Sequence, residues 1–345
     1  MALEAEEYYF DRLALGGGRT EVRKLYYKGE MDCSDVHSMY PSIQIGESID
    51  VLGETIPLLF PVGSPVIEIF DADYYPCNLH FQKPNEICSC SLALKMKHQA
   101  KKLQVVLESP LECSEDIHAY INNFDGILMV DVTPPRDMYH PLLSFRDPDS
   151  KKVIYGCQPL VCQTYASPLL KVAIKHGYVV TKIYRAHRYK MMPSKWKGLM
   201  GAMYKFKFYS SRDEKDISPE EKKVHRKYYD KMFDIDLDFT KCVRRPALKM
   251  SSKVLINSVW GKHAESVDHT QAAVFGNTDY VDADEFYNRI DKNQLKIQQY
   301  HNMGEDRTLF KYKTVRTYKD KVRRPDLHKG YLPCAVFVPM FGQLM

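Results

Sequence analysis

The sequence contains no run of 18 apolar residues, and its first residues are acidic rather than a basic segment followed by an apolar one. A membrane-spanning helix needs about 20 consecutive apolar residues, and a secretory signal needs the basic and then the apolar segment. We therefore expect an intracellular protein that is neither membrane-embedded nor secreted. The sequence also has no internal repeat and no low-complexity segment.

Cysteine pairs with the spacing of a structural zinc site are absent. The chain has nine cysteines, and its closest pairs are Cys88 with Cys90 and Cys157 with Cys162. Neither pair has the C-x-x-C spacing that such zinc sites commonly use. An odd number of cysteines without a secretory signal favours reduced thiols. We therefore expect free cysteines rather than a metal cluster.

Two common nucleotide-binding motifs are missing as well. The sequence has no G-x-x-x-x-G-K-[ST] loop and no G-x-G-x-x-G after a predicted strand. These glycine-rich loops bring backbone N–H groups to phosphates in P-loop and dinucleotide-binding enzymes. Their absence argues against an enzyme of either class.

The chain does contain enough apolar material for two or three packed units, since 44% of its 345 residues are hydrophobic. An almost continuous apolar run at 126–133, stopped by two prolines, predicts a buried strand. Residues 168–188 predict a helix that ends at Gly177 and a strand that follows it. Aromatic and β-branched residues on both sides of a glycine-rich turn predict two short strands within 7–45. Residues 91–108 have helical propensity.

Two further helices have recognisable ends. The letters S-P-E-E from Ser218 predict a capping box with proline in the first turn, and we expect this helix to run to about Met232. Another helix is predicted over 246–260, with Pro246 in its first turn and Gly261 as its C-terminal cap.

The helix at 246–260 carries a polar stripe. Lys249, Lys253 and Asn257 are four residues apart, so they lie close to one helix face. The stripe is about 12 Å long at about 1.5 Å per residue, comparable to an extended triphosphate with its sugar. Leu255 and Ile256 are expected to face a core. Alternatively, the polar side of an amphipathic helix simply meets water.

A basic segment precedes that helix. Residues 185–207 contain seven Lys or Arg and no acidic residue, interleaved with Tyr, Trp and Phe, in a chain of net charge +5. This combination suits phosphate contacts with ring stacking on bases. A solvated surface of an ordinary protein has the same composition, so both interpretations stay open.

Three motifs in order resemble those of family B DNA polymerases. The letters K-V-L-I-N-S-V-W-G at 253–261 match motif B, K-x-x-x-N-S-x-Y-G, with Trp260 in place of Tyr. The letters D-V-H-S-M-Y-P-S-I at 35–43 match motif A, D-x-x-S-L-Y-P-S-I, with Met39 in place of Leu. The segment at 16–29 resembles the one before motif A in the protein-primed branch, found in certain phages, adenoviruses, linear plasmids and self-synthesising transposons. The resemblance covers most of the chain, more loosely between motifs.

This resemblance implies an α+β fold, with an antiparallel sheet of a partial polymerase palm and helical fingers, and without thumb and exonuclease domains. It implies a palm with motif A and a branch-specific insertion over 1–200, fingers with motif B over 201–262, and a return to the palm over 263–345. The second metal-binding carboxylate of such enzymes lies in motif C, Y-x-D-T-D-S. The letters F-G-N-T-D-Y at 275–280 are too close to motif B, and Asn277 stands where the catalytic Asp is needed.

The last residues, 332–345, resemble the helix that leads into motif C. We therefore expect the chain to stop before its second metal ligand, and not to polymerise by itself. Two-metal chemistry needs both carboxylates to hold the ions that neutralise the transition state.

The resemblance also implies roles for individual residues. Asp35 is the implied catalytic carboxylate and holds Mg²⁺ with the backbone carbonyl of Val36, two ions being expected in a complete enzyme. The ring of Tyr40 packs under the sugar and excludes a 2′-hydroxyl. Lys205 is an alternative to Lys207 on the partner helix of the fingers. The implied nucleotide-binding residues are Ser38, Met39, Tyr40, Lys207, Lys249, Lys253 and Asn257. Contacts with the base pair or template are implied for Trp260, Gly261 and Arg19.

The function implied is that of a DNA-directed DNA polymerase, a nucleotidyltransferase that adds dNTPs to a primer 3′-hydroxyl. Its partners are a DNA template-primer, a dNTP and, for this branch, a terminal protein that primes synthesis. The alternative is a non-catalytic nucleic-acid-binding remnant of a transposon or viral polymerase, which would show salt-dependent DNA binding without incorporation.

Overall fold

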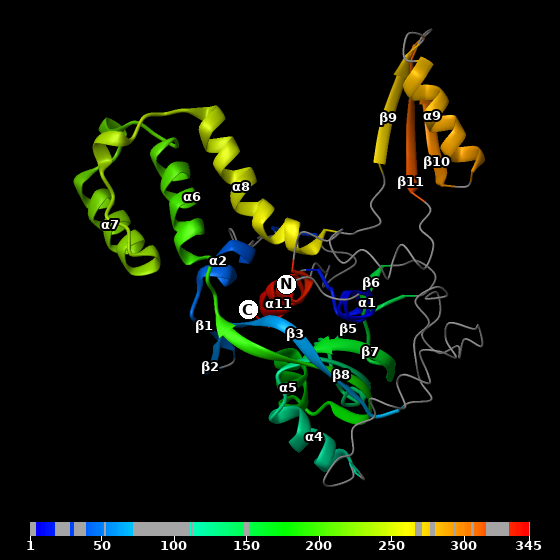
Figure 1. Cartoon of the computed structure of the whole chain (residues 1–345). Helices are drawn as coiled ribbons and strands as arrows, with labels where there is room; N and C mark the ends of the chain where they lie inside the picture. The colour runs from blue at the N-terminus through cyan, green and yellow to red at the C-terminus, as the bar shows by residue number, and fades with distance from the viewer. Residues whose placement is uncertain are drawn as a thin grey trace.

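The computed structural model describes residues 5–17, 28–30, 39–51, 53–71, 111, 113–147, 152–265, 271–276, 280–292, 294–304, 307–314 and 331–344. These residues form helices and antiparallel sheets, so the predicted α+β class is confirmed (Figure 1). None of the helices in these ranges is long and apolar enough to cross a membrane. The helix expected at 91–108 lies outside them.

The largest sheet has four antiparallel strands in the order β3 (Leu59–Ile69), β8 (Val179–Pro193), β4 (Gly126–Thr133) and β7 (Leu160–Ala166). β4 lies inside this sheet, and its first five residues are buried. This burial explains the apolar run, because a strand covered on both faces needs no alternation with polar residues. The predicted buried strand is therefore confirmed.

Gly126 begins β4 where the backbone of β8 passes very closely. Its φ is +155°, and a Cβ at this position would lie 1.9 Å from the carbonyl oxygen of His187. Because no side chain fits this approach, glycine is required here for the pairing of β4 with β8.

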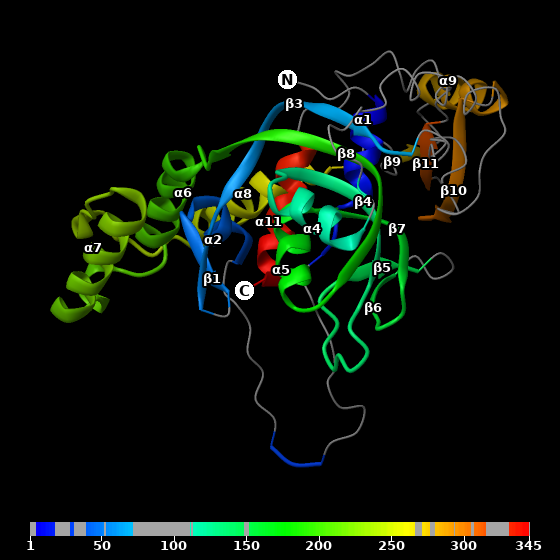
Figure 2. The same cartoon turned by 90° about the horizontal axis from the view of Figure 1, so that it is seen from below.

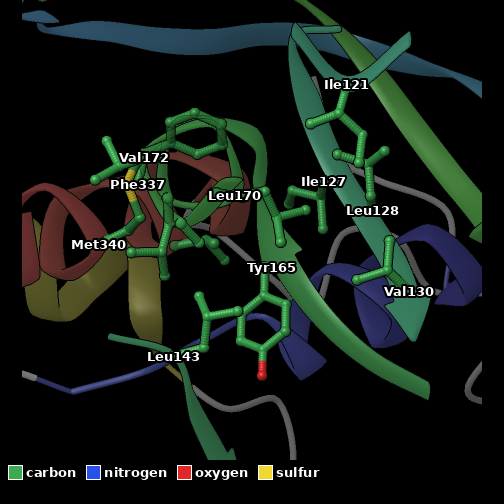
Figure 3. Packing of buried hydrophobic residues seen from close by; sticks show 14 of the residues in the cluster. Ile121, Ile127, Leu128, Val130, Leu143, Tyr165, Leu170, Val172, Phe337 and Met340 are labelled. Carbon is green, nitrogen blue, oxygen red and sulfur yellow. The ribbon is translucent and has the colours of Figure 1, made fainter. Parts of the chain in front are cut away.

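Helices α4 (Ser114–Asn122) and α5 (Ser167–Lys175) pack against the strands of this sheet. As predicted, α5 is followed by Gly177, with a φ of +84°, and then by β8. Figure 3 shows side chains such as Ile121 of α4, Leu128 of β4 and Phe337 meeting in one core.

Helix α11 (Leu332–Leu344) lies at the centre of the molecule (Figures 1 and 2). Almost all of its residues are buried, and it packs against α1 (Ala5–Leu13), α2 (Met39–Ile45), α8 (Pro246–Ala264) and β3. The helix expected over 332–345 is thus present. α11 therefore contacts both α2, which contains the end of the motif A segment, and α8, which contains the motif B segment.

Helices α6 (Lys197–Tyr209) and α7 (Pro219–Phe233) form, with α8, a helical unit that extends away from the sheet (Figure 1). A second hydrophobic core, with Phe208 and Ile256 among its members, holds this unit together. The predicted capping box of α7 is confirmed, because Ser218 and Glu221 each bond the other's backbone N–H.

A third unit consists of β9 (Gln271–Gly276), α9 (Tyr280–Asp291), β10 (Leu295–Asn302) and β11 (Arg307–Thr314). Its strands pair in the order β10-β11-β9, and it has its own core around Phe286. This βαββ unit stands apart from α7 in both views (Figures 1 and 2). The rejected motif at 275–280 lies between β9 and α9, where 277–279 are outside the described residues.

The remaining elements are short. β1 (Ser48–Val51) pairs with β2 (Glu54–Pro57), and β5 (Ser144–Arg146) pairs with β6 (Val153–Tyr155). Two 3₁₀ turns, η1 (Glu214–Asp216) and η2 (Phe239–Lys241), lie between α7 and its neighbours. The five cysteines that the structure describes form no disulfide.

A buried polar network joins α1 to β8. Asp11 accepts a 2.5 Å bond from the Tyr189 hydroxyl and lies 2.9 Å from Nδ1 of His187, whose Nε2 accepts from Arg185. Burial raises the pKa of Asp11, and burial together with the charge of Arg185 lowers the pKa of His187. The neutral His187 ring therefore bridges a buried carboxylate and a buried guanidinium.

This network corrects one sequence-based interpretation. Arg185 is only 3% exposed, and Arg188 is paired with Glu68 at 2.6 Å. The basic segment at 185–207 is therefore not one continuous phosphate-binding surface, because its first arginines have structural partners inside the fold.

The strands expected within 7–45 are also wrong where the structure describes this region. Residues 5–13 and 39–45 are helical. Glu7, Phe10 and Asp11 are buried, and this i, i+3, i+4 spacing is that of one helix face. The aromatic residues of this segment favoured a strand, whereas the spacing of its buried residues is that of a helix.

Two details of α8 differ from expectation. The helix continues to Ala264, so Gly261 is not its C-terminal cap, whereas Pro246 does occupy its first turn. Ile256 is buried as expected, but Leu255 is 52% exposed. One helix turn cannot direct two successive residues to the same narrow interface, since they are about 100° apart.

Candidate nucleotide-binding site

The structure brings three of the predicted lysines together between two helices. Lys249 and Lys253 are exposed on α8, and Lys207 is partly exposed on α6, which packs along α8. Asn257 is also exposed, one turn after Lys253. The polar stripe is therefore accessible rather than buried against the core.

Lys207 lies close enough to Lys253 and Lys249 for their charges to act on it. Partial burial, then the charge of Lys253, then that of Lys249 lower its pKa. Both lysines also lie near a ring, Lys205 at 5.9 Å from that of Tyr209 and Lys207 at 5.5 Å from that of Tyr204, but the charges of Lys253 and Lys249 are found to act on Lys207. The structure thus selects Lys207 over Lys205 as the α6 lysine that faces the α8 stripe.

Neither of the two helices supplies an opposing charge. The sequences of α6 and α8 contain no Asp or Glu, whereas α7 carries three acidic residues. Repulsion among neighbouring cations that have no carboxylate on their own helices is relieved by binding an anion. The arrangement is chemically suited to a group with several negative charges.

At the base of this face, motif A meets motif B. The rings of Tyr40 in α2 and Trp260 in α8 have centroids 4.8 Å apart, with an interplanar angle of 52°. Tilted ring pairs at such distances are favourable contacts. The two sequence motifs, more than 200 residues apart in the chain, are therefore side by side in the fold.

Trp260 is fixed by a hydrogen bond that depends on a proline in α11. Its Nε1 donates to the carbonyl oxygen of Ala335 at 3.0 Å. Pro339 lies inside α11 and has no N–H to donate to the carbonyl four residues earlier, which is that of Ala335. The indole therefore replaces the helical hydrogen bond that the proline removes.

Two glycines shape the neighbourhood. A Cβ at Gly342 of α11 would lie 3.1 Å from Cε of Met39, so α11 limits the space of this motif A side chain. At Gly261, by contrast, a Cβ would meet nothing within 4 Å. The packing that the structure describes does not itself require glycine at 261.

Four of the predicted site residues, Arg19, Asp35, Val36 and Ser38, lie outside the described residues. Among the residues that are described, no group of three or more His, Cys, Asp or Glu could hold a metal ion. The magnesium site at Asp35 and Val36 stays a prediction. Met39 and Tyr40, which follow directly in motif A, are the described residues nearest to it in sequence.

Sequence reasoning missed the contribution of α11. Ala335 accepts the bond from Trp260, Pro339 leaves that carbonyl without a helical donor, and Gly342 lies close to Met39, but none of the three belongs to a motif. A proline inside an otherwise apolar helical segment was the available signal, because it predicts an open carbonyl four residues earlier.

Comparisons with known proteins add no assignment. No protein-family model matches the chain, and neither a curated protein nor a solved structure is found to match it.

Proposed function

We propose that this chain contains the nucleotide-binding site of a DNA-directed DNA polymerase of the family B type. The observation that carries the proposal is the convergence of Lys207, Lys249 and Lys253 on two helices without carboxylates, next to the contact of Tyr40 with Trp260. The incoming dNTP is the polyanion that this surface would bind.

The three lysines would act on the triphosphate as point charges. Charge-assisted hydrogen bonds to phosphate oxygens are shorter and stronger than neutral ones. Asn257 would add an amide donor one turn further along α8. Bound this way, the nucleotide would be oriented before a primer hydroxyl attacks it, which lowers the entropic part of the barrier.

The aromatic pair would define the sugar end of the site. Trp260 is already engaged by Ala335 and Tyr40, so its role in the proposal is to support the Tyr40 ring rather than to contact the base pair directly. Tyr40 would lie under the sugar. Gly261, where the surface is open, would lie towards the nascent base pair.

Magnesium would bind at Asp35 and the carbonyl of Val36. Carboxylate and carbonyl oxygens are the hard ligands that Mg²⁺ prefers. When bound, the ions would supply neutralisation of the charge that develops on the phosphates. The implied partners remain a DNA template-primer and, in the protein-primed branch, a terminal protein.

The binding step is the one to test, because the sequence identifies only one of the two metal-binding carboxylates. With the chain, Mg²⁺ and a template-primer whose next template base is T, dATP should bind at least tenfold more tightly than dGTP, since only dATP pairs with this base. Equilibrium titration of fluorescent dNTP analogues measures the difference.

Changing the next template base to C should reverse the preference. Equal binding of all dNTPs on both templates, together with salt-dependent DNA binding, would reject the polymerase site and favour a non-catalytic DNA-binding protein.

A further inference from the structure

A pocket of about 280 Å³ lies where the helical unit joins the sheet and α11. Its lining comes from 60–63 of β3, from 192–196 at the end of β8 and just after it, from His263 of α8, and from Tyr331 and Cys334 at the start of α11. We refer to it as the root pocket, and it contains none of the site lysines. We infer that the root pocket binds a flat molecule of two fused aromatic rings that carries one anionic group.

The walls of the root pocket are aromatic. The rings of Phe60 and Trp196 have centroids 5.5 Å apart and meet edge to face, and those of Trp196 and His263 are 5.2 Å apart. Rings in such orientations offer both faces and edges to another aromatic ring. The pocket therefore favours a flat aromatic occupant over a branched aliphatic one.

Polar groups of Tyr331, His263 and Cys334 in the wall are bonded to other wall residues. The Tyr331 hydroxyl donates to the carbonyl of Gly63, and its backbone N–H donates to Nδ1 of His263 at 2.8 Å. The thiol of Cys334 lies 3.4 Å from the carbonyl oxygen of Pro61, and burial raises its pKa to about 12. A ligand that needs many hydrogen bonds, such as a purine base, would lose its bonds to water without replacing them.

Volume and charge specify the ligand further. An apolar cavity of about 150 Å³ holds one benzene ring, so about 280 Å³ suits two fused rings. Lys195 lines the pocket, is exposed, and forms no ion pair with any residue that the structure describes. A single anionic substituent on the ligand would meet this ammonium group at the rim.

The probe for this inference is naphthalene-2-carboxylate, titrated calorimetrically into the full chain. Val62→Trp should fill the pocket and weaken binding at least tenfold, because Val62 is part of its lining. Val66→Trp is the matched control on the same strand, since Val66 is 63% exposed and outside the pocket. Val66→Trp should leave the affinity unchanged.

The rim charge has its own variant. Lys195→Gln should weaken naphthalene-2-carboxylate about two- to fivefold, the range of an exposed ion pair, and leave the uncharged naphthalene-2-methanol unaffected. Should Val62→Trp fail to fold, Val62→Phe and Val66→Phe replace the first pair of variants.

Three results would overturn the inference: no saturable binding to the wild type, equal affinities for the Val62 and Val66 variants, or adenine binding as tightly as naphthalene-2-carboxylate. None of these measurements involves dNTP or DNA. Failure of ligand binding in the root pocket would therefore leave the proposed nucleotide site unaffected. Failure of dNTP binding would likewise leave the root pocket unaffected.

Discussion

Lys207 has a lowered pKa because it is partly buried and faces Lys253 and Lys249. A bound triphosphate would raise this pKa, since a nearby anion favours the charged ammonium. The contribution of Lys207 to dATP affinity is then fully present below the pKa of free Lys207 and declines as pH rises from there towards the higher pKa of the bound state. The decline should begin at lower pH than for an ordinary lysine, whose pKa is about 10.4.

Lys207→Arg provides the control for this pH dependence. Arginine stays protonated throughout this range, so the decline in dATP affinity between neutral pH and about pH 10 should be smaller in the variant. The same pH profile for wild type and variant would show that Lys207 does not contact the triphosphate.

Trp260 and Pro339 provide a second prediction at this scale. Trp260→Phe leaves the buried carbonyl of Ala335 without its indole donor, so we expect a loss of about 1–3 kcal/mol in the free energy of unfolding. In a Pro339→Ala background, residue 339 regains an N–H that can donate to the Ala335 carbonyl. Trp260→Phe should then lower the free energy of unfolding by less.

Chemical denaturation of the wild type, both single variants and the double variant gives the coupling free energy. Additive effects within about 0.5 kcal/mol would contradict the link between the proline and the indole.

Residue spacing in the sequence was sufficient to predict an exposed face with Lys249, Lys253 and Asn257. It could not decide between Lys205 and Lys207, because that choice depends on how α6 is rotated against α8. Nor could it predict that Arg185 is buried, since Arg185 bonds to His187 on the same strand and His187 in turn bonds to Asp11 of a distant helix.

At the scale of elements, the capping box of α7 makes a pH prediction. Bonding to the Ser218 backbone N–H and the nearby Arg212 lower the pKa of Glu221. The ionised Glu221 therefore stabilises the folded protein above the ordinary glutamate pKa of about 4.3. This stabilisation is lost as pH falls through the lower pKa that Glu221 has in the folded protein. Glu221→Gln should lower the Tm near neutral pH, and its difference from wild type should vanish near about pH 3.

Glu220→Gln is the matched control, because Glu220 is exposed in the same turn and outside the capping box. An equal drop in Tm for both variants would assign the effect to the helix dipole instead of the cap.

Elements with local signals were predictable. Ser218 with Glu221 marked the start of α7, and the apolar run at 126–133 marked β4. α1 and α2 were not predictable, because their local composition is compatible with strands. Their helical form depends on packing of α1 against α11 and β7, and of α2 against α11 and α8. The end of α8 was missed because Gly261 suits a cap, although the helix continues three residues further.

At the scale of the whole molecule, three of the hydrophobic cores among the described residues differ in size and predict unequal local stability. The sheet with α11 has the largest core, the α6–α8 unit has a second one, and the βαββ unit has the smallest. Buried apolar area determines the free energy of local opening. Native-state hydrogen exchange should therefore show β10 and β11 opening at lower denaturant than β4 and α11, whereas one common opening free energy would contradict three independent cores.

The most direct test of the central claim is dNTP binding by a site variant and a control variant of equal charge change. Lys253→Ala removes a cation of the α8 stripe, and Lys227→Ala removes an exposed lysine from α7. We predict that dATP binding, measured by equilibrium titration with Mg²⁺ and a matched template-primer, weakens by roughly 10- to 150-fold in Lys253→Ala, the value of one charged hydrogen bond. Lys227→Ala should bind like wild type, and equal affinities for the two variants would contradict the claim that the α6 and α8 lysines hold the triphosphate.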